Sequence, residues 1–172
     1  GESVVEHWDH DIKNQVRTQV CQGGPYKNVL LLPSESCLDV IEMLNNNSID
    51  KETRIVAIER DYYTAETIKE KLKELNFTSF TVLNTELHLA ELDGQFDYVY
   101  LDTCGQLTAS IINWLSTQVQ EKRFAKDCKI VLAFSMYMRG SFEFIQSWEK
   151  YLIKAKKPKA VVNPSQLGTD SA

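Results

Sequence analysis

Two carboxylates close short apolar runs of the sequence and are its strongest candidates for chemistry. Glu59 ends the run at residues 54–59, and Asp102 ends the run at residues 96–102. A carboxylate at the end of a buried parallel strand can accept hydrogen bonds from both hydroxyls of a ribose, and we favour this role for Glu59. The alternative for Glu59 is a surface carboxylate near a helix N-terminus, stabilised by the helix dipole. Asp102 is expected to point into the crevice beyond the strand ends.

The loop after the first apolar run, residues 28–32, lacks glycine at a place where a nucleotide-binding domain needs close backbone approach. It consists of Pro33, Ser34, Glu35 and Ser36. The sequence contains neither G-x-G-x-x-G nor G-x-x-x-x-G-K-[ST], which disfavours a nicotinamide oxidoreductase or a P-loop enzyme. A nucleoside ligand without phosphates is more compatible with this loop. Either serine is also expected to cap the next helix, and Ser36 forms a possible capping box with Asp39.

Further polar and aromatic residues follow the later apolar runs. Asn84 and Thr85 follow the third run, where an amide could meet a purine edge, although a plain polar loop is equally compatible. Cys104 follows Asp102 and could be a nucleophile, but no partner histidine is identifiable and an inert buried thiol is the favoured interpretation. Tyr137 could stack on a planar group and Arg139 could meet a substrate carboxylate or phosphate. Packing at the sheet rim is the alternative for both.

Hydrophobic spacing predicts an alternation of strands and helices. Near-continuous apolar runs predict strands at residues 28–32, 54–59, 77–83, 96–101 and 128–134. Apolar residues three and four apart predict helices at residues 5–20, 37–44, 62–75 and 108–124, and another capped by Ser141 that carries Ile145, Trp148 and Leu152. Because the strands are apolar throughout, the sheet should be buried on both sides. We therefore predict an α/β fold with a doubly wound, mostly parallel sheet and helices on both faces.

Composition limits the class of protein. The 172 residues are 43% hydrophobic and 25% charged, which matches one globular domain with a continuous core. A net charge of −5 disfavours a protein that binds phosphate backbones with its whole surface. It does not exclude a local basic patch. The four cysteines have no paired C-x-x-C spacing, so we expect free thiols and no metal site. No apolar stretch reaches bilayer length, and no leader opens the sequence, so the expected location is intracellular and cytoplasmic, with the nucleus open.

The chain divides into three expected parts. Residues 1–24 form a helical segment packed on the core, residues 25–157 form the α/β domain, and residues 158–172 form a tail. The tail could hold a short edge strand at residues 160–162. The sequence leaves the oligomeric state open.

With these residues in place, residues 27–139 resemble the class I, S-adenosylmethionine-dependent methyltransferases, which have a Rossmann-like fold. Residues 29–36 look like the first motif of the family, residues 55–59 like its acidic second-strand motif, and residues 96–104 like its F-D-x-h-x-h-D motif. Two departures accompany the resemblance. The first loop lacks the glycines of the family, and the chain lacks room after its fifth helix for the usual antiparallel strand pair, so the sheet could be truncated or completed by a partner.

The resemblance implies S-adenosylmethionine as cofactor and assigns roles to individual residues. The first loop, Pro33 to Ser36, would contact the methionine part, and Glu59 would hold the ribose. Asn84 and Thr85 would hold the adenine, and Asp102 would face the methyl acceptor as hydrogen-bond acceptor or base. Cys104, Tyr137 and Arg139 would contact the acceptor.

Two functions therefore stay open. The first is methyl transfer, with a nucleic acid slightly favoured over a small molecule as acceptor because residues 150–159 are basic. The second is a catalytically silent scaffold or regulatory subunit that keeps the fold and binds a protein partner. The glycine-free loop favours the scaffold, whereas Glu59 and Asp102 favour the enzyme.

Overall fold

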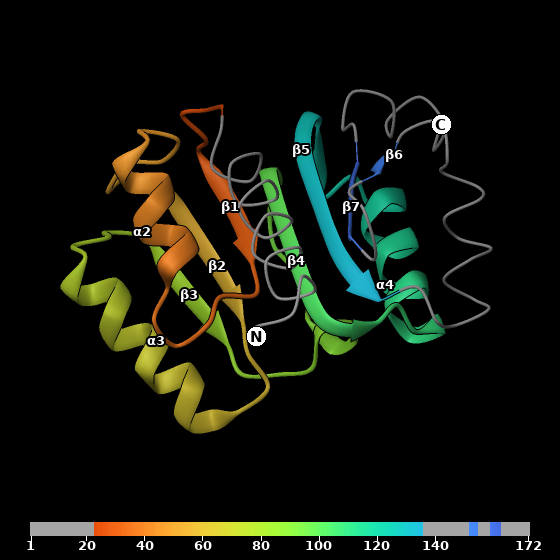
Figure 1. Cartoon of the computed structure of the whole chain (residues 1–172), viewed down its shortest axis with the longest axis horizontal. Coiled ribbons are helices and arrows are strands. Elements are labelled where there is room, and N and C mark those ends of the chain that lie inside the picture. The colour runs from red at the N-terminus through yellow and green to blue at the C-terminus, as the bar shows by residue number, and fades with distance from the viewer. Residues whose placement is uncertain (1–22, 136–151, 155–158, 163–172) are drawn as a thin grey trace, which may run out of the picture.

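The computed structural model describes residues 23–135, 152–154 and 159–162, and in these residues seven strands form a single sheet. The strands are β1 (Asn28–Leu31), β2 (Arg54–Ile58), β3 (Phe80–Leu83), β4 (Phe96–Gln106), β5 (Phe124–Ser135), β6 (Leu152–Lys154) and β7 (Lys159–Val162). The helices are α2 (Leu38–Asn45), α3 (Tyr62–Glu74), α4 (Ala109–Gln120) and the 3-10 turn η1 (Leu87–Leu89). The sheet order is β3-β2-β1-β4-β5-β7-β6, as Figure 1 shows for most of its width.

The first five strands are parallel, and the chain reverses its direction of travel across the sheet between β1 and β4. From β1 it moves outward to β2 and β3, then returns to the other side of β1 to form β4 and β5. Because right-handed crossovers on opposite sides of the first strand put their helices on opposite faces, this order is doubly wound. The predicted fold class is confirmed.

Side chains alternate between two cores, one on each face of the sheet. In β1, Val29 and Leu31 pack into the core that contains Val40 of α2 and Ile68 of α3. Leu30 instead packs into the second core, with residues of β4, β5 and α4. Val29 and Leu30 are fully buried, as expected for a central parallel strand that is covered on both sides.

Trp114 attaches α4 to the segment that follows η1. Its ring is 94% buried, and its Nε1 donates a hydrogen bond to the carbonyl oxygen of Ala90 at 2.9 Å. This contact holds η1 against the helix.

The first prediction concerns this contact. Trp114→Phe should lower the free energy of unfolding by about 1–3 kcal/mol, because the buried Ala90 carbonyl loses its partner. Urea denaturation measures the change. Asn113→Ala, an exposed position of the same helix, is the control and should change stability by less than about 0.5 kcal/mol. Equal stability of Trp114→Phe and the wild type would contradict the assigned role.

Several element boundaries differ from the sequence-based prediction. Strand β3 begins at Phe80 rather than at residue 77, and β5 begins at Phe124 rather than at residue 128. Helix α4 ends at Gln120 rather than at residue 124, and its buried residues are Trp114, Leu115 and Gln118.

The C-terminal part of the sheet corrects two further expectations. Leu152, expected on a helix, begins β6. The strand expected at residues 160–162 exists as β7, but it pairs antiparallel with both β5 and β6 and is not an edge strand. The sheet is therefore not truncated, because β6 and β7 supply the antiparallel pair that the sequence seemed to lack. The other residues of the helix expected after Ser141, the helix expected at residues 5–20 and the tail from residue 163 lie outside the described residues.

Two of the four cysteines can be assessed. Cys37 and Cys128 are buried free thiols. Burial raises the pKa of Cys37 to about 11, and burial also raises the pKa of Cys128. Both thiols are therefore protonated and poorly nucleophilic near neutral pH.

Candidate functional site

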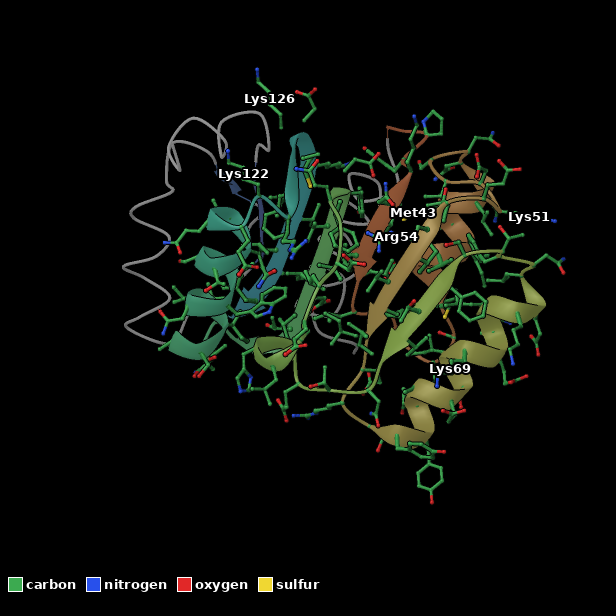
Figure 2. All side chains as sticks on the ribbon, turned by 180° about the vertical axis from the view of Figure 1, so that it is seen from behind. Met43, Lys51, Arg54, Lys69, Lys122 and Lys126 are labelled. Carbon is green, nitrogen blue, oxygen red and sulfur yellow. The ribbon has the colours of Figure 1, made fainter. Side chains whose placement is uncertain are left out.

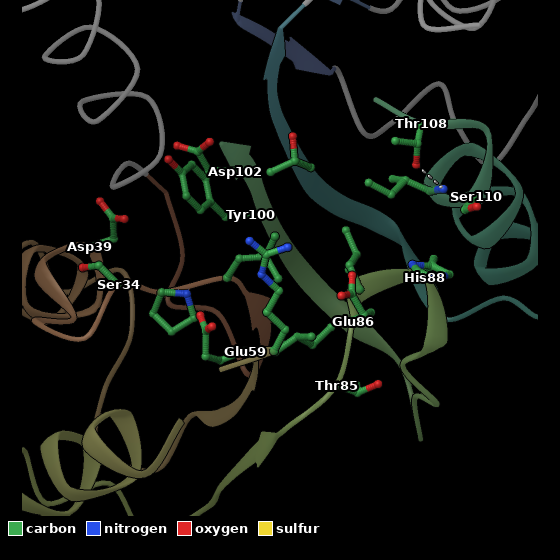
Figure 3. A pocket seen from close by; sticks show the side chains of 17 residues that line it. Ser34, Asp39, Glu59, Thr85, Glu86, His88, Tyr100, Asp102, Thr108 and Ser110 are labelled. Carbon is green, nitrogen blue, oxygen red and sulfur yellow. Dashed lines mark hydrogen bonds between the residues drawn. The ribbon is translucent and has the colours of Figure 1, made fainter. Parts of the chain in front are cut away.

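A cleft of about 710 Å³ opens at the carboxyl ends of β1, β2, β3 and β4 (Figure 3). Its walls come from the segments after these strands and from the first turns of α2 and α4. The lining consists of Leu32, Pro33, Ser34, Asp39, Ile58, Glu59, Arg60, Thr85, Glu86, Leu87, His88, Tyr100, Asp102, Thr103, Thr108, Ser110 and Ile111. The cleft lies where the chain reverses direction between β1 and β4, which is where open parallel sheets bind ligands.

The segment after β1 forms one wall, and its geometry differs from the predicted helix cap. Ser34 Oγ and Ser36 Oγ lie 2.9 Å apart and share a hydrogen bond, while the Cys37 amide donates to the Ser34 carbonyl at 3.0 Å. Cys37 has a φ of 52°, in the left-handed region, and α2 begins only at Leu38 without a side-chain cap. The predicted capping box is therefore wrong, because a turn intervenes between the serines and the helix.

Glu59 stands directly after β2 and lines the cleft. One of its carboxylate oxygens, Oε1, accepts a hydrogen bond from the Asp61 amide at 2.9 Å. Asp61 in turn caps α3 by accepting from the amide and hydroxyl of Thr64, both at 2.9 Å. These hydrogen bonds from Thr64 lower the pKa of Asp61, so the cap stays ionised at neutral pH.

Asn84 supports this segment from β3 and does not line the cleft. Its Nδ2 donates hydrogen bonds to the carbonyl oxygens of Glu59 at 3.0 Å and Arg60 at 2.9 Å. The amide expected to meet a ligand is thus a brace that holds the backbone of Glu59 and Arg60 in place.

The second prediction tests this brace. Asn84→Ala should speed hydrogen exchange of the Asp61 amide by up to about 30-fold, because the two lost hydrogen bonds are worth about 1 kcal/mol each and the Glu59 segment loosens. Asn84→Asp keeps the side-chain shape but removes both donors, so it should behave like alanine. Exchange in Asn84→Asp at the wild-type rate would show that the donors do not hold the segment.

The wall after β3 carries the polar cluster of residues 84–88, in which sequence reasoning expected an amide or carboxylate to meet a purine edge but assigned only Asn84 and Thr85 as site residues. Thr85, Glu86 and His88 line the cleft together, on and before η1, whereas only Thr85 was among the predicted residues. Figure 3 places Glu86 and His88 between Thr85 and the Thr108 end of α4. Their position soon after a strand is the feature of the sequence that could have identified Glu86 and His88. It does not distinguish them from the other residues of the same loop.

Asp102 lies on β4 and not in a loop beyond it, because the strand continues to Gln106. The strand runs through Gly105, and Asp102 pairs in register with Ala133 of β5. Since residues two apart in a strand share a face, Asp102 stands on the same face as Tyr100, which also lines the cleft. Thr103, which also lines the cleft, donates to the Gly105 and Ala133 carbonyls at 3.0 and 3.3 Å.

The structure brings five predicted site residues together in one cleft, namely Pro33, Ser34, Glu59, Thr85 and Asp102. Glu35, Ser36 and Asn84 do not line it. The side chain of Cys104 and all of Tyr137 and Arg139 lie outside what the structure describes.

Besides Glu86 and His88, further polar lining residues beyond the predicted set come from neighbouring segments. They are Asp39, Arg60, Thr103, Thr108 and Ser110. Asp39 and Ser110 stand in the first turns of α2 and α4, and Thr108 caps α4 by accepting from the Ile111 amide at 3.2 Å. Only the three-dimensional arrangement brings these helix starts to the cleft.

The described part of the chain contains neither a candidate metal site nor a candidate membrane-spanning helix. No group of three His, Cys, Asp or Glu side chains there could hold a metal ion. None of the described helices is long and apolar enough to cross a membrane.

Comparison with known proteins finds solved structures of similar fold but no match by sequence. No protein-family model and no curated protein matches the sequence. Among solved structures, a methyltransferase from Pseudomonas syringae matches with a TM-score of 0.60 at 11% identity, over 87% of this chain and 96% of that one. The N-methyltransferase NodS from Bradyrhizobium japonicum matches with a TM-score of 0.57 at 10% identity, over 91% and 97%. The chain thus has the Rossmann-like fold of the class I methyltransferases.

Larger methyltransferases match over part of their length. Coclaurine N-methyltransferase, solved with N-methylheliamine and S-adenosylhomocysteine, matches with a TM-score of 0.50 at 13% identity, over 77% of this chain and 37% of that one. The chain likewise spans 41% of the O-methyltransferase StiE.

Proposed function

We propose that this chain binds S-adenosylmethionine in the cleft and transfers its methyl group to an acceptor. The observation that carries the proposal is the meeting of Ser34, Glu59 and Asp102, from the ends of three adjacent strands, in one cleft of about 710 Å³. This volume is in the range of small-molecule sites, about 300–1,000 Å³. The fold supports the proposal, since coclaurine N-methyltransferase was solved with S-adenosylhomocysteine.

The lining residues fit the parts of this cofactor. Glu59 has one carboxylate oxygen on the Asp61 amide, and its other oxygen is suited to accept from ribose hydroxyls. Pro33 and Ser34 would lie against the methionine part, and Thr85 with Glu86 would lie at the adenine. The bound cofactor supplies an electrophilic methyl group on a sulfonium. The chain contributes alignment of the two reactants and the Asp102 carboxylate beside the acceptor.

The charge of the cleft also fits. Asp39, Glu59, Glu86 and Asp102 contribute four carboxylates to the lining, against the guanidinium of Arg60. A sulfonium with an ammonium group is attracted by such a lining, whereas a pyrophosphate is repelled. This charge pattern disfavours a nicotinamide dinucleotide in addition to the missing glycine motif.

A second candidate is a silent scaffold or regulatory subunit that binds a protein. It is favoured by the first loop, which contains no glycine. The buried side chain of Pro33 stands where a glycine would let the backbone approach a ligand closely. Under this alternative the cleft would remain but would bind the cofactor weakly or not at all.

Calorimetric titration with S-adenosylhomocysteine and with NAD separates these candidates. Methyl transfer predicts saturable binding of S-adenosylhomocysteine and none of NAD at the same concentrations. Absence of heat with S-adenosylhomocysteine at millimolar concentration would refute the proposal and leave the scaffold. The nucleic-acid preference depended on residues 150–159, of which the structure describes only 152–154 and 159.

A further inference from the structure

We propose that the methyl acceptor is a small organic amine with an aromatic or apolar body, and not a nucleic acid. The inference rests on the proposed function and specifies the substrate of the same cleft. Three features of the described residues carry it: the charge of the lining, the apolar residues around it, and the position of the unpaired lysines.

The lining remains negative after the cofactor is bound. Its four carboxylates outnumber the single guanidinium of Arg60 by three, and no lysine is among the described lining residues. S-adenosylmethionine carries two positive groups and one negative group, so it offsets only part of this charge. A polyanionic acceptor would approach this cleft against electrostatic repulsion, whereas a protonated amine would be attracted.

Exposed apolar side chains gather at the same edge of the sheet. Among the described residues the exposed large hydrophobic side chains are Leu38, Tyr62, Tyr63 and Leu89, with 53 to 80% of their surface accessible. None of the four is part of the cleft lining, but Leu38 precedes the lining residue Asp39 in the sequence and Leu89 follows the lining residue His88.

The two tyrosines extend this apolar edge at the start of α3. Tyr62 and Tyr63 follow the segment of Glu59 and Arg60, and their rings stand edge to face with centroids 5.5 Å apart. Ring faces attract cations as well as planar groups. Exposed apolar surface beside an acidic cleft suits a ligand that has an apolar body and a cationic head.

Basic residues lie at the opposite end of the strands. Lys51 precedes β2, Lys122 precedes β5 and Lys126 stands near the start of β5. Figure 2 shows Lys126 at the top, Lys122 at the upper left and Lys51 at the right edge, all above the lower end at which the parallel strands finish. Lys69, on α3, is paired with Glu66 at 3.0 Å. These four lysines therefore do not form a path for a phosphate backbone to the cleft, and Arg60 is the one cation among the described lining residues.

Transfer of the methyl group to an amine needs only the cofactor, the amine and a proton acceptor. An ammonium first loses a proton to solvent or to the Asp102 carboxylate, which leaves a lone pair on nitrogen. The nitrogen attacks the sulfonium methyl, and the electron pair of the breaking carbon–sulfur bond goes to sulfur. The products are S-adenosylhomocysteine and a methylated ammonium.

The test compares probes that share a phenyl ring and differ in the charge of the head group. Phenethylamine, 2-phenylethanol and phenylacetate are titrated into the full chain with saturating S-adenosylhomocysteine, together with a short single-stranded oligodeoxynucleotide. The inference predicts that the amine binds about tenfold or more tightly than phenylacetate at low salt, and that the preference shrinks in about 0.5 M salt. Asp102→Asn, which removes the carboxylate beside the acceptor and keeps cofactor affinity, should reduce the preference several-fold, and Tyr63→Ala should weaken the amine and the alcohol alike. Lys126→Gln, at the opposite end, is the matched control.

The outcomes distinguish this inference from the proposed function. Failure of S-adenosylhomocysteine to bind removes both. Binding of S-adenosylhomocysteine with the oligonucleotide or phenylacetate as the tightest probe, or with no probe bound, overturns the amine acceptor and leaves methyl transfer standing. A preference for the amine that Asp102→Asn leaves intact also overturns it, because the carboxylate beside the acceptor would not be its cause.

Discussion

Replacing Asp102 with asparagine is expected to lower kcat of methyl transfer by about 10²–10⁴-fold, the range found for loss of a positioned general acid or base. Asparagine has nearly the same shape as aspartate but cannot accept a proton at neutral pH. The affinity for S-adenosylhomocysteine should change by less than about threefold, because Asp102 is assigned to the acceptor and not to the cofactor. Single-turnover rates and calorimetry measure the two quantities separately.

The position of Asp102 explains why the effect should be confined to the chemical step. It is held within β4, in register with Ala133, so that the strand itself fixes the direction of the carboxylate. Asp127→Asn, an exposed carboxylate near the start of β5, is the control and should leave kcat unchanged. If Asp102→Asn retains the wild-type rate, or loses affinity for the cofactor as much as it loses rate, the assigned role is wrong.

Glu59→Ala is expected to weaken binding of S-adenosylhomocysteine by roughly 30-fold, which corresponds to about 2 kcal/mol for hydrogen bonds to a charged acceptor. Two effects contribute, because the carboxylate would lose the ribose hydroxyls and the Asp61 amide would lose its acceptor. Calorimetric titration measures the affinity directly.

Glu59→Gln separates these two effects. Glutamine keeps a carbonyl oxygen for the Asp61 amide but loses the charge, so its affinity should fall between those of the wild type and Glu59→Ala. Glu70→Gln, on the exposed surface of α3, should bind like the wild type. Unchanged affinity in Glu59→Ala would place the ribose elsewhere.

Most of the parallel sheet follows from the sequence because its central strands are locally unambiguous. Residues 28–31 and 54–58 are apolar runs too short for helices, and both became β1 and β2 within one residue of the predicted ends. Helix α3 agrees equally well, with Ala65, Ile68 and Leu72 on its buried side as their spacing predicts. In these segments local preference and tertiary packing favour the same structure.

Boundaries that depend on pairing were predicted less well. Strand β4 continues past Asp102 because β5 offers a partner as far as Ser135, which apolar spacing does not reveal. Strand β7 similarly depends on pairing with β5 and β6, and its position between them cannot be derived from a run of four residues.

The sequence by itself determined the parallel α/β class and the placement of Ser34, Glu59 and Asp102 near the carboxyl ends of three strands, because strands buried on both faces stand out as continuous apolar runs. The tertiary structure alone decided that these three residues share one cleft, that Asn84 braces Glu59 rather than lining the cleft, and that Asp39, Glu86 and His88 join them. Those relations join segments far apart in the sequence. They follow from the order of strands in the sheet, which no local pattern specifies.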